Sequence, residues 1–424
     1  MPPTAESGDA ARRPRLAILG AGPIGLEAAL AAADAGMPFT LYEAGPAVAA
    51  SVRAWGHVRL FTPWEMDVSP RMRRRLEAAG ESAPGAKVAG AAAANGAAAC
   101  PTGNDLAEQV YDRVAALPAI APRLRLGTRV LAVGREGLLK HEEIATAGRA
   151  RQPFRLLLAG ADGAERIEHA EVVIDATGTF GHPNTLGDGG IPAPGEIRLG
   201  DEVRRTIPDL AREAGDWAGR TVLLAGGGAS AQTAVRDLAE LARSAPGTRV
   251  VWALRRAEPS WGSPPDDPLP ARARLAAAAA ELAAGASPAV AAERGVVVEA
   301  IARDGTAGRL AVSLRPTGPG PNGTRQVAVD RVLALTGSVG DHHLYRQLQV
   351  HECYATSGPM KLSAALLGAA AGDCLEQTSH GVEALTNPEP GFYILGSKSY
   401  GRNNSFLLRV GWQQVSEVFA ALPG

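Results

Sequence analysis

LAILGAGPIG, residues 16–25, is the stretch that decides the fold. Four apolar residues run directly into glycines at positions 20, 22 and 25, and an alanine-rich stretch follows up to Gly36. This order indicates a strand, a tight turn and a helix that begins at the turn. The first glycine permits the turn, the second lets the backbone approach a pyrophosphate, and the third lets the helix pack closely on the strand. The free N–H groups at the helix N-terminus also attract phosphate. We therefore predict a dinucleotide site formed by Gly20, Gly22, Pro23, Ile24 and Gly25.

A second copy of the pattern is TVLLAGGGASA, residues 221–231. It again places glycines between an apolar strand and a predicted helix, with alanine at the third position, a common alternative to glycine there. We predict a second dinucleotide site formed by Gly226, Gly228, Ala229, Ser230 and Ala231. Two such turns in one chain suggest a protein that holds two dinucleotides and passes a hydride between them.

The residue that ends the second strand differs between the two units. Glu43 stands there in the first unit, where a carboxylate can accept hydrogen bonds from a ribose diol. The second unit has Arg255 and Arg256 at this place. Guanidinium groups bind a 2′-phosphate with charge-assisted bonds, whereas a carboxylate would repel it. The second site is therefore expected to prefer NADPH to NADH, the alternative being an ordinary solvated basic turn.

Composition excludes several classes of protein. The net charge is −1, which gives no electrostatic reason to bind nucleic acid or an anionic membrane. No apolar run approaches the roughly 20 residues of a membrane span. The three cysteines, Cys100, Cys353 and Cys374, form no disulfide framework and no CxxC pair, so we expect no metal site and a reducing, cytoplasmic location. Residues 1–14 read as a disordered leader without a secretory signal. The Ala/Gly-rich segment 86–99 reads as a mobile surface loop.

The order of the predicted elements indicates one α/β domain inserted into another. A predicted strand precedes Thr177-Gly178, another precedes Thr336-Gly337, and the second glycine unit lies between them. We expect residues 15–200 and 331–424 to form the first domain, and residues 201–330 to form the insert.

These motifs resemble the two-dinucleotide-binding flavoproteins, especially the flavin-containing monooxygenase-like branch. The resemblance rests on residues 20–27, 176–178, 226–231, 255–256, 336–337 and 395–397. It implies a doubly wound, three-layer, Rossmann-like domain that binds FAD and an inserted Rossmann-like domain that binds NADPH. It also implies cofactor contacts from Thr177, Gly178, Thr336, Gly337, Gly396 and Ser397. Two features depart from the family pattern: the FxGxxxHxxxYP segment survives only as residues 180–183, and Ser397 follows Gly396 where related reductases have aspartate.

Further candidates lie in two polar or aromatic segments. In and just before residues 55–64, Arg59 or Arg53 is expected to neutralise phosphate, and Thr62 and Trp64 are expected to lie against the flavin. The alternative is a packed aromatic loop, and His57 is more simply a structural histidine than a proton donor. In residues 398–405, Lys398 and the start of the last helix are expected near the flavin's pyrimidine edge, where positive charge stabilises the reduced ring. The alternative for Lys398 is a solvated side chain.

We expect an FAD- and NADPH-dependent oxidoreductase, specifically a monooxygenase that acts on a small organic molecule. Such an enzyme needs no redox-active side chain, only a dry pocket. The alternatives are an NADPH-dependent reductase of a small disulfide or another acceptor, with Cys353 as its single thiol, and a flavin-binding redox sensor. The missing cysteine pair argues against two-cysteine disulfide reductases. No catalytic residue stands out beyond the weak candidates Lys398, His57 and Cys353, and a homodimer is compatible with the sequence.

Overall fold

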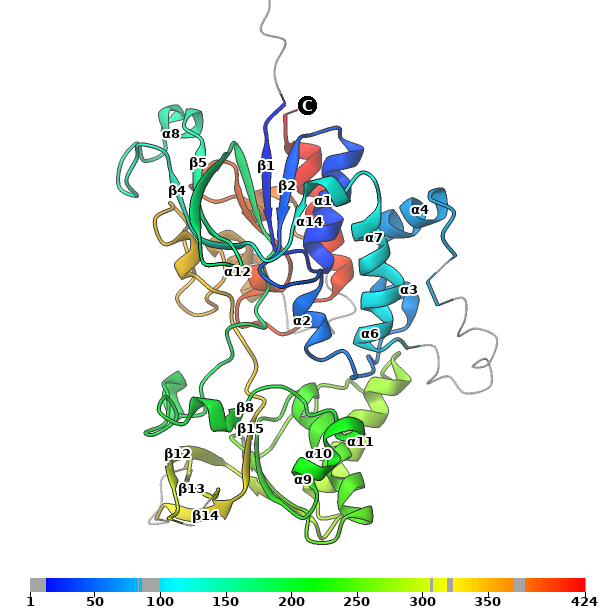
Figure 1. The fold of residues 1–424 in the computed structure, drawn as a ribbon. Coiled ribbons are helices and arrows are strands. Elements are labelled where there is room, and N and C mark those ends of the chain that lie inside the picture. The colour runs from blue at the N-terminus through cyan, green and yellow to red at the C-terminus, as the bar shows by residue number, and fades with distance from the viewer. Residues whose placement is uncertain are drawn as a thin grey trace, which may run out of the picture.

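A computed structural model of the chain describes residues 13–82, 84–85, 100–305, 308–318, 323–368 and 378–423. These residues form two lobes joined by two chain segments (Figure 1). Most of the expected leader, the segment 86–99 and Cys374 lie outside the described residues.

The first lobe is built on a five-stranded parallel sheet. Its strand order is β16 (Phe392–Ile394), β7 (Val172–Asp175), β1 (Leu16–Leu19), β2 (Phe39–Tyr42) and β3 (Leu124–Arg125). All residues of β1 and β7 are buried, as expected for parallel strands covered on both faces.

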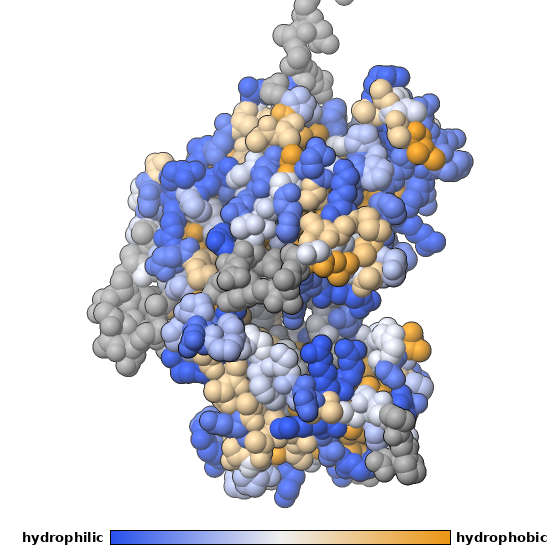
Figure 2. All heavy atoms as spheres, turned by 180° about the vertical axis from the view of Figure 1, so that it is seen from behind, coloured by the Kyte–Doolittle hydropathy of each residue, from blue (hydrophilic) through white to orange (hydrophobic). Residues whose placement is uncertain are grey.

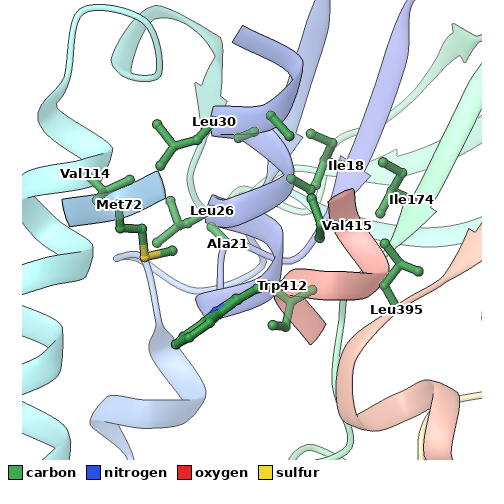
Figure 3. Packing of buried hydrophobic residues seen from close by; sticks show 14 of the residues in the cluster. Ile18, Ala21, Leu26, Leu30, Met72, Val114, Ile174, Leu395, Trp412 and Val415 are labelled. Carbon is green, nitrogen blue, oxygen red and sulfur yellow. The ribbon is translucent and has the colours of Figure 1, made fainter. Parts of the chain in front are cut away.

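Helices cover one face of this sheet and a second sheet covers the other. Leu26 and Leu30 of α1 (Pro23–Asp34) pack with Val415 of α14 (Leu408–Ala421) and Ile18 of β1 in one apolar cluster (Figure 3). On the opposite face, the antiparallel sheet β4 (Arg129–Arg135), β5 (Phe154–Ala159) and β6 (Glu165–Ala170) packs its apolar residues against Ala17 and Leu19 of β1. This gives the three layers that the sequence predicts. The other helices of the lobe are α2 (Ala50–Arg53), α3 (Trp64–Asp67), α4 (Pro70–Ala78), α6 (Gly103–Leu106), a π-helical turn (Ala107–Tyr111), α7 (Asp112–Ala116), α8 (Ala147–Arg151), α12 (Met360–Gly368) and α13 (Val382–Leu385).

The second lobe repeats this architecture. Its parallel sheet has the order β11 (Val290–Arg294), β10 (Arg249–Leu254), β9 (Thr221–Ala225), β15 (Arg331–Ala334) and β8 (Val203–Arg204). α10 (Ala229–Ser244) and α11 (Pro270–Ala283) pack on one face, and α9 (Leu210–Trp217) contacts α10. The antiparallel sheet β12 (Val296–Arg303), β13 (Leu310–Pro316) and β14 (Arg325–Val329) packs on the other face.

The junctions between the lobes differ from the boundaries we expected. β15, which we assigned to the first domain, pairs with β9 in the second sheet. Leu186, Ala193 and Leu199, also assigned to the first domain, belong to the core of the second lobe. The two connecting segments meet where Pro183 bridges Ser338 and the Asn184 amide donates to the Gly337 carbonyl at 2.9 Å. We therefore propose that the insert runs from Asn184 to Thr336, because strand pairing, which the sequence does not reveal, decides the membership of β15.

Figure 2 shows hydrophilic side chains interspersed with apolar ones over both lobes on the face opposite to Figure 1. None of the helices in the described residues is long and apolar enough to cross a membrane.

Candidate functional site

A large cavity lies at the carboxyl ends of the strands of the first sheet. It has a volume of about 820 Å³, within the range of roughly 300–1,000 Å³ that is typical of small-molecule and cofactor sites. Residues at or just after the ends of four strands line it: Leu19 (β1), Glu43 (β2), Ala176 (β7) and Leu395 (β16). This edge of a doubly wound sheet is where ligands bind. We call it the first cavity.

The first glycine turn forms one wall of this cavity. Gly20 has a φ of +92°, and a Cβ there would lie 2.7 Å from the Ala176 carbonyl oxygen. A Cβ on Gly25 would lie 1.8 Å from the Gly20 carbonyl oxygen, so this glycine lets α1 start against the turn. A Cβ on Gly22 would meet no atom of the described residues within 4 Å. Gly20, Gly22, Pro23 and Ile24 line the cavity, whereas Gly25 lies behind them.

Glu43 lies beside the glycine turn at the end of β2. Its carboxylate accepts hydrogen bonds from the Ala21 amide at 2.9 Å and the Gly45 amide at 2.8 Å, and the residue lines the cavity. The side chain is thus oriented by the glycine turn itself. In the described part of the chain no side chain caps the N-terminus of α1, so its free N–H groups are available to a phosphate.

The opposite wall comes from the ends of β7 and β16. Thr177, Gly178, Gly396 and Ser397 line the cavity, as the resemblance implies. So do Leu407 to Arg409, where α14 begins with a leucine at its N-cap position. A helix N-terminus therefore faces this part of the cavity, as the sequence predicts.

Lys398 lies behind this wall. It is 1% exposed, and its Nζ donates to Asp175 Oδ2 at 2.6 Å and to Thr177 Oγ1 at 3.2 Å. Asp175 Oδ1 in turn accepts from the Thr177 amide and hydroxyl. The alternative of a solvated Lys398 is wrong, and its ammonium holds the cavity wall instead of lining the cavity. The sequence placed it in a polar loop and carried no signal for its buried partner.

The residues of segment 55–64 differ in which cavity they line. Thr62 is buried and lines the first cavity, whereas Trp64 is buried against Gly85 and lines neither cavity described here. Arg59 lines the second cavity, and its guanidinium donates to the Cys100 carbonyl at 2.5 Å. His57 lines neither cavity, and its Nε2 is buried without a partner among the described residues. The packed-loop alternative thus describes Trp64 and His57.

Asp67 is a site residue that the sequence analysis missed. It ends α3, lines the first cavity and is 4% exposed. Burial raises the pKa of its carboxyl to about 7, although hydrogen bonding from Thr62 opposes this rise. Its position in the sequence, three residues after Trp64 in an apparently ordinary turn, gives no sign of its burial.

The second cavity lies between the lobes and has a volume of about 750 Å³. Ala229 and Ser230, at the N-terminus of α10, line it, together with four arginines: Arg59, Arg205, Arg236 and Arg274. A Cβ on Gly228 would meet no described atom within 4 Å, whereas one on Gly226 would lie 2.2 Å from the Leu335 carbonyl oxygen. Ala231 is fully buried behind the turn. Arg255 and Arg256 follow β10, are exposed and lie outside this cavity.

The two cavities share part of their walls. Trp55, Leu60, Phe61 and Phe180 line both of them. Thr336 and Gly337 line neither: the Thr336 hydroxyl donates to the Asn184 carbonyl at 2.8 Å, so this pair holds the two connecting segments together. The two cavities are therefore neighbours, and the four residues that they share are apolar.

Neither cysteine within the described residues lines a cavity. Cys100 and Cys353 are buried, free thiols. A hydrogen bond from Thr356 lowers the pKa of the Cys353 thiol. No cluster of metal-ligating side chains occurs within the part of the chain that the structure describes.

Solved structures with a similar fold include flavin-dependent enzymes. The sequence matches no protein-family model and no curated protein. The chain is similar to bacillithiol disulfide reductase Bdr from Bacillus cereus, with 19% identity, a TM-score of 0.66, and coverage of 97% of this chain and 99% of that one. It is also similar to the ornithine N-hydroxylase of Kutzneria sp. 744, with 14% identity, a TM-score of 0.61, and coverage of 97% and 99%. A flavin-containing monooxygenase from Stenotrophomonas maltophilia is similar too, with 16% identity, a TM-score of 0.54, and coverage of 97% of this chain and 98% of that one. The chain therefore has the fold of the two-dinucleotide-binding flavoprotein oxidoreductases.

Proposed function

We propose that this protein is an FAD-dependent oxidoreductase that takes hydride from NADPH. The observation that carries the proposal is the pair of cavities, each at a glycine turn and a helix N-terminus, with a shared wall of four residues. Hydride transfer requires the donor and acceptor rings to be in contact, so the two sites must adjoin. The four residues that line both cavities place these cavities side by side.

The first cavity fits FAD. Gly22 leaves open space beside the start of α1, where a pyrophosphate would receive backbone N–H groups, and Glu43 stands ready for the ribose. Thr177, Gly396 and the start of α14 would face the isoalloxazine ring, which supplies hydride acceptance when bound. Thr62, which we expected to lie against the flavin, also lines this cavity and donates a hydrogen bond to Asp67.

The second cavity and its surroundings fit NADPH. Gly228 is open beside the start of α10, as Gly22 is at the first site. Four arginines line this cavity and no carboxylate of the described residues does. Arg205 and Arg236 are paired with Glu196 and Asp237, so the positive charge comes chiefly from Arg59 and Arg274. Arg255 and Arg256 follow β10 just outside the cavity, where they would hold the 2′-phosphate. The ornithine N-hydroxylase structure similar to this chain holds reduced FAD, NADP+ and ornithine, which supports the same pairing of ligands here.

We further propose that the enzyme is a monooxygenase of a small organic substrate. Neither Cys100 nor Cys353 lines either cavity, so no described thiol is placed to exchange with a disulfide beside the flavin. The walls near Trp55, Phe61, Phe180, Phe406 and Trp412 are apolar, which helps to exclude water during oxygen chemistry. The competing proposal is an NADPH-dependent reductase with Cys353 as its thiol.

Rapid mixing distinguishes these two functions. The protein would be loaded with FAD, reduced anaerobically with NADPH and then mixed with oxygenated buffer. A monooxygenase would show a transient absorbing species before oxidised flavin returns, and the same trace in Cys353→Ala. Direct reoxidation in one step, with disulfide reduction abolished by Cys353→Ala, would overturn the monooxygenase proposal.

A further inference from the structure

The side chain of Asp67 is a buried carboxyl whose hydrogen-bond partner is the Thr62 hydroxyl. Both of its oxygens lie near the Thr62 hydroxyl oxygen, at 2.8 and 2.9 Å. A hydroxyl carries one proton, so it can serve only one of these oxygens at a time. A carboxylate offers about four acceptor positions, and an unpaired buried charge is costly.

Among the groups that act on the Asp67 carboxyl, only the Thr62 hydroxyl favours its charged form. Glu65, on the same short helix and also lining the cavity, raises the pKa of Asp67. The Tyr111 and Cys100 side chains interact with it from the segments packed nearby, and burial raises the pKa of both, so they remain neutral. Arg409 lines the same cavity from α14, which packs against α3. The salt bridges between described residues include none to Asp67, and the raised pKa of its carboxyl has burial as its largest cause.

We propose that Asp67 is a catalytic residue of the first cavity and supplies the proton that each turnover consumes. This inference rests on the proposed function only in its general form, that of an NADPH-dependent flavoenzyme. NADPH gives up a hydride, which is one hydrogen nucleus with two electrons. Oxygenation of a substrate S follows NADPH + H⁺ + O₂ + S → NADP⁺ + SO + H₂O, and reduction of a disulfide likewise takes up one proton with each hydride.

The Asp67 carboxyl gives up one proton and takes one back in each turnover. The O–H bond of Asp67 breaks, its electron pair stays on the carboxylate oxygen, and the proton moves to the reacting ligand in the cavity. The carboxylate then regains a proton from water. Burial keeps the proton on Asp67 up to neutral pH, and the pKa of about 7 suits an acid that must release and regain a proton near that pH.

The first test needs no cofactor. Unfolding of the ligand-free protein by urea would be followed from about pH 4 to about pH 9 for the natural protein, Asp67→Asn and Glu77→Gln. Glu77 is an exposed carboxylate on α4 and serves as the matched control. Because the folded-state pKa of Asp67 is raised, the natural protein and Glu77→Gln should lose stability as pH rises through this range, and Asp67→Asn should lose less. Equal pH dependence in Asp67→Asn and the natural protein would overturn the inference.

The second test uses the FAD-loaded protein. Turnover with NADPH should fall with rising pH above about 7 in the natural protein. In Asp67→Asn, turnover at pH 7 should be about 100-fold or more lower than in the natural protein, and it should no longer depend on pH in this way. The amide that this substitution introduces still accepts a hydrogen bond from Thr62, so folding should be retained. Thr62→Val removes the hydroxyl that donates to Asp67 and should shift the pH profile upward.

The two proposals fail in different ways. If the natural protein binds no FAD, or bound flavin is not reduced by NADPH, the proposed function fails. If the natural protein is reduced normally but Asp67→Asn turns over within about twofold of it with the same pH profile, only the role of Asp67 is refuted.

Discussion

Replacing Gly22 by alanine separates the cofactor role of the first glycine turn from its structural role. The Cβ of alanine at this position would meet no described protein atom within 4 Å, and the backbone φ of −77° suits any residue. Gly25→Ala differs: its Cβ would lie 1.8 Å from the Gly20 carbonyl oxygen, so α1 would have to move away from the turn.

The expected magnitudes follow from these environments. Gly22→Ala should change the free energy of unfolding of the ligand-free protein by about 1 kcal/mol or less. The same methyl group would occupy the space beside the helix N-terminus, and overpacking a close contact costs about 1–3 kcal/mol. FAD affinity should therefore fall by about 5- to 150-fold. Gly25→Ala should lower both the stability and the affinity.

The assay combines urea unfolding with titration of FAD, followed by flavin fluorescence. Gly228→Ala is the matched control, since its Cβ also meets no described atom within 4 Å but lies at the second turn. It should leave FAD affinity unchanged and weaken NADPH binding. Unaltered FAD affinity in a folded Gly22→Ala protein would refute the assignment of this turn to the pyrophosphate.

Three further predictions concern charge. Lys398→Met should lower the free energy of unfolding by about 3–5 kcal/mol, because it leaves the buried Asp175 carboxylate without the ammonium that lies 2.6 Å away. In a double-mutant cycle followed by urea unfolding, adding Asp175→Asn should recover part of this loss. Arg255→Ala combined with Arg256→Ala should raise the KM for NADPH by about 10-fold or more and leave that for NADH unchanged; an equal effect on both coenzymes in steady-state assays would contradict our interpretation. For Asp67, the pKa rises from 3.8 to about 7, which corresponds to at most roughly 4 kcal/mol of folding free energy. The natural protein should lose this stability between about pH 4 and 7, whereas Asp67→Asn should not lose it in the same urea titration.

Local sequence patterns predict the glycine turns well. At Gly20, Gly22 and Gly25 the sequence places the turn, the open position and the close packing of α1 correctly, because each depends on neighbours within one strand–turn–helix unit. Glu43 is similarly local, since its carboxylate binds the turn that precedes its own strand. The three-layer architecture followed from the resemblance and is confirmed by the sheets.

Contacts between distant segments set the limits of the sequence analysis. The sequence places Lys398 at the flavin edge or, alternatively, in solvent, and it gives no sign of Asp175, which is 223 positions away and accepts a hydrogen bond from the Lys398 ammonium. We assigned β15 to the first domain, and only its pairing with β9 shows that it belongs to the second sheet. Asp67 appears ordinary because its burial depends on segments that pack around α3.

Anaerobic mixing of the FAD-loaded protein with a stoichiometric amount of NADPH tests the central claim most directly. If the two adjoining cavities, which share Trp55, Leu60, Phe61 and Phe180, hold two dinucleotides in contact, the flavin absorbance should bleach, and faster with NADPH than with NADH. Flavin that is bound in the first cavity but stays oxidised in the presence of excess NADPH would contradict the account.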